Sequence, residues 1–164
     1  MLSYLKFLWR STNQHGVHSP FVYAYVTRGL YKAYRFRGPR ACKILFRTLA
    51  YFKVPDITIT EEHPALTGLL KGYFPGIPIV PSGGKLYYFN AGLQPDDVPG
   101  LLNIAKSDPD RILVIEGIHR RKTSARAWKM IRTNPSITVT VDLFYAGVVF
   151  FREGQARENF IIRP

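Results

Sequence analysis

The stretch RILVIEGIHRRKTSARAWKMIRTNPSITVTVDLFYAGVVFF, residues 111–151, contains the elements that decide the fold. Its run Ile112–Ile115 is apolar without interruption, which is typical of a strand buried on both faces of a parallel sheet. Thr123 or Ser124 can cap a following helix, whose apolar side chains recur at helical spacing. The stretch therefore predicts a central strand followed by a helix that crosses the sheet.

The sequence on both sides of this strand and helix continues the same pattern. On the C-terminal side, residues 137–141 and 148–151 flank residues 143–147 and predict an antiparallel hairpin. On the N-terminal side, short apolar runs alternate with helices, and the expected elements are strands at 57–60, 77–80 and 85–89 with helices that begin at Pro64 and after Asp97. We therefore expect an α/β fold with a Rossmann-like, mostly parallel sheet, right-handed crossovers and a C-terminal antiparallel hairpin.

Residues 1–53 differ from the rest and are expected to be helical throughout. Ser19 and Pro20 supply a capping hydroxyl and a proline at the first helical position. Residues 37–39, Arg-Gly-Pro, break the chain, and a second helix follows with an apolar stripe between Ala41 and Phe52. We expect residues 1–53 to form a helical extension packed on an α/β domain of residues 54–164, as a single structural unit.

Composition narrows the class of protein. The chain has 164 residues, 46% of them hydrophobic and 21% charged, which indicates one globular domain. No apolar run reaches the roughly 18 residues of a membrane-spanning helix, and the apolar opening Met1–Trp9 is not followed by a cleavage site. Cys42 is the single cysteine, so an internal disulfide is excluded and a buried thiol is expected. These features predict a cytoplasmic protein without a membrane partner.

The net charge of +12 is concentrated near the N-terminus. Residues 1–55 contain ten Lys or Arg and no Asp or Glu. Such asymmetry is typical either of a solvated basic face or of a surface for nucleic acid, anionic lipid or an acidic partner. Tyrosines interleave with basic residues over 23–37, a pattern that suits stacking on single-stranded nucleic acid but equally a dimer interface.

Both ends of the chain carry a family pattern. The segments that carry it cover roughly half of the sequence, and they are NQHGVHSPFV at 13–22, LFR at 45–47, YFK at 51–53, AW at 127–128, ITVTVDLF at 137–144, VFFR at 149–152 and QARENFIIR at 155–163. In this order they resemble a bacterial family of class I S-adenosylmethionine-dependent, O-methyltransferase-like proteins. The resemblance implies a methyltransferase-type sheet, here shortened by about one strand–helix unit before Lys85.

The chain departs from that family where its first strand ends. The family has a Gly-rich loop there, because glycines let the backbone approach the cofactor closely at the head of a helix. This chain has ITITEEHP at 57–64, with no glycine and with a proline that removes a backbone donor. Thr60 and Glu61 are thus the candidate cofactor-binding residues. We expect no bound cofactor, and S-adenosylmethionine if the chain is active.

Two later strand ends have also changed. The family's Asp-Gly, whose carboxylate helps to hold a divalent metal in related enzymes, is replaced by Asn90-Ala91, and no metal site is expected. The family's acidic pair before Ile-His becomes Glu116-Gly117-Ile118-His119. Asn90, Glu116 and His119 are the candidate catalytic residues, because open α/β sheets bind ligands beyond the carboxyl ends of their strands.

Two smaller groups of polar residues have alternative interpretations. His15 and His18 are spaced to share a helical face as metal ligands, or they shape the entry to a helix. Glu61, Glu62 and His63 could form an acid–base cluster, or they occupy an exposed helix N-terminus where the helix dipole favours carboxylates.

Three functions stay open on the sequence. The prediction is a methyltransferase-like protein without catalysis, which acts as a homodimer or by binding an active relative. The first alternative is an active S-adenosylmethionine-dependent methyltransferase on a small acceptor, using Asn90, Glu116 and His119. The second alternative is a basic protein that binds nucleic acid or another anion, and steep weakening of its binding with salt would support it.

Overall fold

A six-stranded sheet forms the centre of the computed structural model, which describes residues 4–152 and 154–164 except for the side chains of Ala105 and Lys106. The strands, in the spatial order β1-β2-β3-β5-β4-β6, are β1 (Ile57–Ile59), β2 (Leu86–Phe89), β3 (Ile112–Glu116), β5 (Ala146–Phe150), β4 (Val139–Asp142) and β6 (Glu158–Ile161). β1, β2 and β3 are parallel, β5 is antiparallel to both of its neighbours, and β6 is parallel to β4. The α/β class, the mostly parallel sheet and the hairpin are therefore confirmed.

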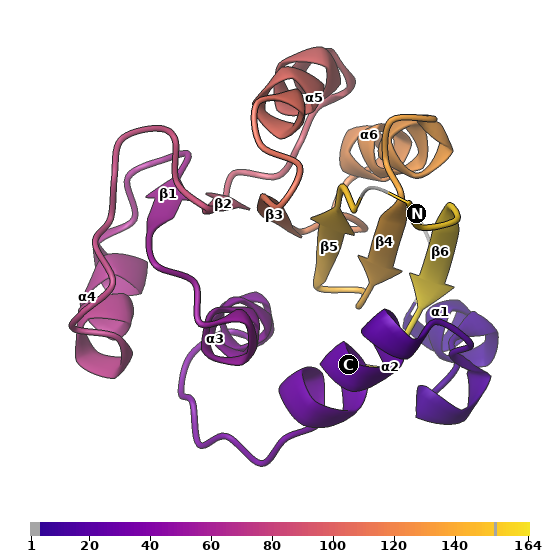
Figure 1. Ribbon diagram of the computed structural model, residues 1–164, viewed down its shortest axis with the longest axis horizontal. Helices are drawn as coiled ribbons and strands as arrows, with labels where there is room; N and C mark the ends of the chain where they lie inside the picture. Colours follow the sequence, from indigo (N-terminus) through magenta and orange to yellow (C-terminus); the bar gives the residue numbers. More distant parts are fainter. Residues whose placement is uncertain (1–3, 153) are drawn as a thin grey trace.

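Helices cover both faces of the sheet (Figure 1). They are α1 (Tyr4–Arg10), α2 (Pro20–Tyr25), α3 (Arg40–Phe52), α4 (Pro64–Tyr73), α5 (Val98–Lys106) and α6 (Lys122–Thr133), with a π-helical turn at Val26–Leu30 and 3-10 turns at Gln14–Gly16 and Pro95–Asp97. Helices α5 and α6 lie on one face, and α2 and α3 lie on the other (Figure 1). This three-layer arrangement follows from strands whose side chains are apolar on both faces.

The two faces of the sheet have separate hydrophobic clusters. Tyr88 and Val114 face α2, α3 and α4, whereas Leu113 and Ile115 face α5 and α6. The cluster on the first side also includes Tyr25 from α2, so the N-terminal helices share one core with the sheet. No helix in the described part of the chain is both long and apolar enough to cross a membrane.

The helix starts follow capping chemistry. Ser19 caps α2, where its side chain accepts a hydrogen bond from the Val22 N–H at 3.5 Å, and Pro20 takes the first helical position as expected. His63 caps α4, where its Nδ1 accepts from the Leu66 N–H at 3.1 Å. The N-cap of α6 is Arg121, so the prediction of Thr123 or Ser124 as its cap is wrong, and both lie inside the first turn.

Two expected elements are absent because proline and tertiary packing override local pattern. The strand predicted at 77–80 is reduced to one bridge between Ile57 and Ile79, because Pro78 has no N–H to extend a ladder. Residues 11–13, 17–19 and 31–39 are not helical, so the prediction of helix throughout residues 1–53 is wrong in these segments, and its residues 1–3 lie outside the described part of the chain. In segment 31–39, Phe36 packs edge-on against Phe46 and Tyr73, which requires the chain to leave the helix.

Strand β6 was not expected from the sequence. It pairs with β4, and the side-chain hydroxyl of Thr140 donates to Asn159 Oδ1 at 2.6 Å. Just beyond it, the Thr12 N–H donates to the Ile161 carbonyl at 2.8 Å, and the Arg163 N–H donates to the Thr12 carbonyl at 3.1 Å. The edge of the sheet is thus tied to the segment between α1 and α2.

Candidate functional site

The carboxyl ends of β1 and β2 bring three of the sequence-predicted residues together. The Glu61 N–H donates to Asn90 Oδ1 at 3.0 Å, and Asn90 Nδ2 donates to the Glu61 carbonyl at 3.0 Å. The Thr60 hydroxyl also lies 3.2 Å from Asn90 Oδ1. The side-chain amide of Asn90 therefore fixes the position of the loop after β1, because it bonds both the N–H and the carbonyl of Glu61.

Glu116, at the end of β3, belongs to a second network. Its Oε2 accepts from the Tyr88 hydroxyl at 2.6 Å, and its Oε1 accepts from Arg120 Nη2 at 2.8 Å. Burial and the adjacent Glu116 carboxylate raise the pKa of Tyr88 well above its ordinary value, so this hydroxyl stays protonated as the donor. Burial, with the Glu116 charge, also raises the pKa of the Cys42 thiol, which is buried as expected.

His119 is held by a buried carboxylate that the sequence reasoning did not select. Its Nε2 lies 2.8 Å from Asp142 Oδ2 and 3.0 Å from Oδ1. Asp142, which is 1% exposed, also accepts from Trp128 Nε1 and from the Phe144 N–H, each at 3.0 Å. Because carboxylate oxygens accept, Nε2 is the protonated ring nitrogen, and the buried Nδ1 has no hydrogen-bond partner.

One signal in the sequence could have identified Asp142. It is the single acidic residue in the otherwise apolar and Thr-containing run 137–151, and it directly ends a strand expected to be buried. A carboxylate in such a position must be hydrogen-bonded, which makes a nearby histidine or tryptophan a natural partner.

The candidate residues divide between two cavities. A cavity of about 460 Å³ beside the end of β1 is lined by Thr60 and Glu61, together with residues of the 90s loop and α5. A second cavity, of about 380 Å³, is lined by Glu116 and His119 together with Arg40 and other residues of α3 and the β4–β5 loop. Asn90 lines neither cavity. The five predicted site residues therefore do not form one reaction centre.

The smaller polar groups have structural positions. His15 lies in a 3-10 turn and His18 precedes the cap of α2, so they do not share a helical face. His63 uses its ring nitrogen to cap α4, while Glu61 and Glu62 are exposed. Within residues 4–152 and 154–164, no group of three or more His, Cys, Asp or Glu side chains is arranged to hold a metal ion.

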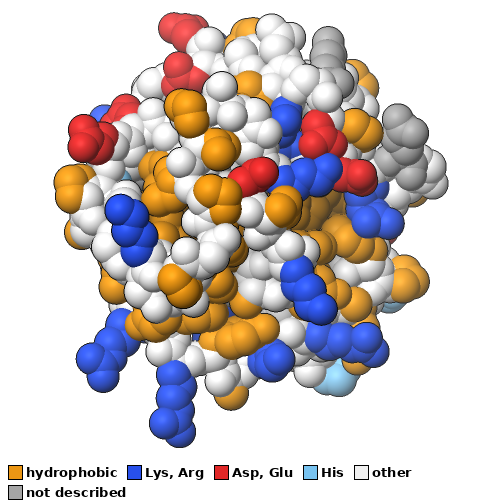
Figure 2. All heavy atoms as spheres, turned by 60° about the vertical axis from the view of Figure 1, so that its left-hand side comes forward, with side chains coloured by type: hydrophobic (Ala, Val, Ile, Leu, Met, Phe, Trp, Pro, Cys, Tyr) orange, Lys and Arg blue, Asp and Glu red, His pale blue; other side chains and the backbone are white. Residues whose placement is uncertain are grey.

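The interleaved tyrosines do not form one continuous surface. Tyr25 is fully buried, bonds to the Thr48 hydroxyl at 2.7 Å and has its pKa raised by burial. Tyr34 lies in the irregular segment after the π-helical turn. Figure 2 shows acidic side chains in the upper part of one face with Lys and Arg side chains beside them, whereas Lys, Arg and His side chains without acidic ones lie in its lowest part.

The geometry as a whole shows polar groups bonded to one another at the strand ends, with a His–Asp pair enclosed by aromatic rings. His119 lies 5.5 Å from the Phe144 ring and 6.1 Å from the Phe7 ring. The His119 ring lines the cavity of about 380 Å³, but its Nε2 is bonded to Asp142 and its Nδ1 is buried. No family model, no curated protein and no solved structure matches this chain.

Proposed function

We propose that this chain is a methyltransferase-like α/β domain without catalysis, which acts through self-association or by binding an active relative. The observation that carries the proposal is the use of Asn90 and Glu116 in internal hydrogen bonds at the strand ends. Side chains that are held in internal hydrogen bonds in this way are less available to bind or activate a substrate.

The sheet topology supports the methyltransferase-like part of the proposal. Enzymes of the class that the sequence resembles end a mostly parallel sheet with an antiparallel hairpin. Here β5 follows β4 through a tight connection and is inserted antiparallel between β3 and β4. Fold likeness alone does not establish an activity, so the proposed loss of catalysis depends on the side chains at the strand ends.

The loop after β1 supports the absence of a nucleoside cofactor. A cofactor such as S-adenosylmethionine would need free backbone donors at the start of α4. The Thr60 N–H instead donates to the Tyr88 carbonyl at 3.0 Å, and the Glu61 N–H donates to Asn90. The Leu66 N–H donates to His63, and Pro64 has no N–H. These engaged N–H groups support the proposal that the loop does not hold this cofactor.

Helix α1 supports action through a protein partner. Leu5 and Trp9 lie one turn apart on the same face and are 78% and 90% exposed, whereas Phe7 between them is fully buried. A tryptophan this exposed contributes nothing to the core, and Trp is the residue type most enriched among interface hot spots. The pair is the most exposed of the large hydrophobic side chains in the described chain.

The cofactor part is tested by calorimetric titration with S-adenosylmethionine and S-adenosylhomocysteine. We expect no heat and no thermal stabilisation at millimolar ligand, because the N–H groups of Thr60, Glu61 and Leu66 are already bonded and Pro64 has none. One-to-one binding in the micromolar range would contradict the non-catalytic assignment and would favour a methyltransferase that acts on a small acceptor.

The partner part is tested by sedimentation velocity of the Trp9→Ser variant. We expect the wild type to self-associate and the variant to dissociate about 30-fold more readily, which is the effect of losing a hot spot worth about 2 kcal/mol. Met130→Ser, at a 38% exposed site on α6, is the matched control and should leave association unchanged. A wild type that stays monomeric at millimolar concentration would refute self-association and leave binding of a relative.

A further inference from the structure

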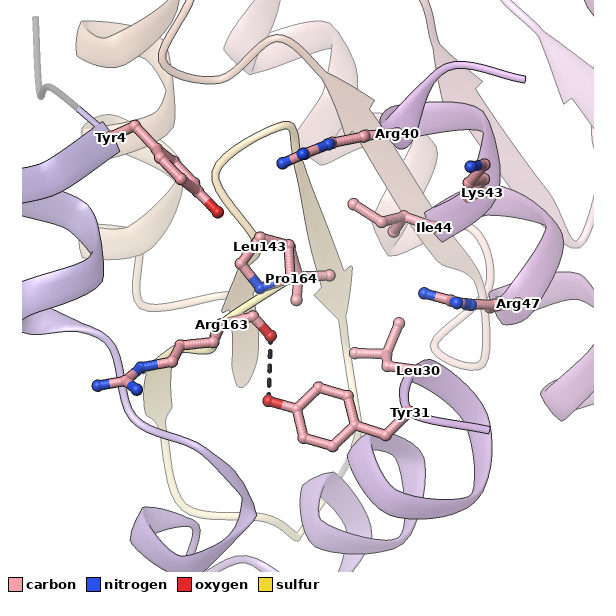
Figure 3. Close-up of a pocket in the computed structure, with 10 residues that line it drawn as sticks. All are labelled: Tyr4, Leu30, Tyr31, Arg40, Lys43, Ile44, Arg47, Leu143, Arg163 and Pro164. Carbon is pink, nitrogen blue, oxygen red and sulfur yellow. Dashed lines mark hydrogen bonds between the residues drawn. The ribbon is translucent and has the colours of Figure 1, made fainter. Parts of the chain in front are cut away.

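A cavity of about 310 Å³ lies between α3 and the end of the chain after β6 (Figure 3), and it shares Tyr4 and Arg40 with the cavity that Glu116 and His119 line. Arg40, Lys43 and Arg47 line it from α3, at spacings of three and four residues that place them on one helical face. Leu30, Ile44 and Leu143 supply apolar lining. The cavity thus combines a cationic wall with an apolar one.

The positive charges at this wall have no acidic partners. Among the residues that the structure describes, no Asp or Glu lines the cavity. The ion pairs of the described residues use other cations, namely Lys85, His119 and Arg120. Arg40 donates to the neutral Tyr145 hydroxyl at 2.6 Å and stacks on its ring, so its charge is not compensated. The charged side chains that line the cavity are therefore all positive.

Arg47 is a cation on this wall whose side chain is partly buried. Its Nε is buried and has no hydrogen-bond partner. Because the Nε is buried, the part of Arg47 that can meet a ligand in the cavity is the end of its guanidinium group, and an oxyanion is the acceptor that a guanidinium binds best. In Figure 3, the Arg40 and Arg47 side chains extend from α3 toward Leu143 and Pro164, whereas the Arg163 guanidinium extends away. The Tyr31 hydroxyl donates to the Arg163 carbonyl at 3.0 Å, which closes the opposite side.

We propose that this cavity binds a small phosphorylated organic molecule, whose phosphate contacts Arg47, Lys43 and Arg40. Its volume is at the lower end of the range for small-molecule sites. Arginine suits a phosphate because its planar fork of donors matches two phosphate oxygens, and lysine adds a point charge. The apolar side chains that share the cavity suit the organic part of the ligand. This inference is independent of the proposed function.

The experiment is a titration of the full chain with phenyl phosphate, followed by ³¹P NMR and calorimetry, with inorganic phosphate as a second probe. Saturable one-to-one binding is expected, with the phenyl ester binding more tightly than inorganic phosphate. Arg47→Gln should weaken binding about tenfold to a hundredfold, which is the effect of losing a charged hydrogen bond. Lys43→Gln should also weaken binding. This second variant tests the proposal if the Arg47 variant does not fold.

The matched control is Arg126→Gln, which removes the same charge from an exposed position on α6. Its affinity for phenyl phosphate should equal that of the wild type. The proposal would be overturned if the Arg126 and Arg47 variants weakened binding equally. It would also be overturned if chloride displaced phenyl phosphate at the same ionic strength, because binding would then depend only on the overall positive charge. Tighter binding of a short single-stranded oligonucleotide, with the same dependence on Arg47, would assign the surface to nucleic acid instead.

Discussion

Asp142→Ala is expected to lower the free energy of unfolding by about 3–5 kcal/mol, measured by urea denaturation followed by circular dichroism. The substitution removes the acceptor of three groups at once, namely His119 Nε2, Trp128 Nε1 and the Phe144 N–H. The indole and backbone donors would be left buried without partners, and each such group costs about 1–3 kcal/mol.

Two further variants make the result specific to this carboxylate. Asp110→Ala removes a carboxylate that is 82% exposed and lies 3.9 Å from Lys85, so its effect should stay within about 0.5 kcal/mol. Asp142→Asn keeps an acceptor oxygen and should give an intermediate loss. If Asp142→Ala cost no more than Asp110→Ala, the buried network would not be a major source of stability.

Gly147→Ala is expected to lower the free energy of unfolding by about 2–4 kcal/mol, by the same measurement. A Cβ built at Gly147, in β5, would lie 2.5 Å from Trp128 Cη2 and 2.6 Å from Cζ3, which is far inside van der Waals contact. The indole cannot move away freely because its Nε1 is bonded to Asp142. The added methyl group should therefore also weaken the hydrogen bond from Trp128 Nε1 to Asp142.

The matched control for this variant is Gly68→Ala, in the middle of α4. A Cβ at Gly68 would meet nothing within 4 Å, and the position is exposed. Alanine there should raise the free energy of unfolding by about 0.5–1 kcal/mol, because glycine is the weaker helix former. Opposite signs for the two glycine variants are the expected outcome, and equal effects would contradict the packing of Trp128 on β5.

The parts of the fold that could be predicted are those in which local pattern and tertiary environment agree. The run Ile112–Ile115 is apolar because β3 is covered on both faces, and Pro64 begins α4 because the first helical position needs no N–H. The irregular segment 31–39 and strand β6 depend instead on distant partners, Tyr73 and β4. The local sequence of segment 31–39 and of β6 does not indicate either partner.

The candidate site shows the same division. Topology places Asn90 and Glu116 at one edge of the sheet, and that much follows from parallel strands. Whether such side chains remain free depends on neighbours that the sequence does not place beside them, such as the Glu61 backbone for Asn90 and Tyr88 for Glu116. Asp142 was missed because its partners, His119 and Trp128, precede β4 on other elements.

The pairing of Thr12 with the segment after β6 has a consequence for synthesis on the ribosome. The hydrogen bonds of Thr12 to Ile161 and Arg163, and that of Gln155 Nε2 to the Ser19 hydroxyl at 3.0 Å, cannot form until residues 155–163 have been translated and have left the exit tunnel. Phe7 and Tyr25 also have late ring partners, Phe144 and Phe150, so both rings are incompletely covered while the first helices emerge. Nascent chains of this protein are consequently expected to engage chaperones until residues 155–163 have left the exit tunnel.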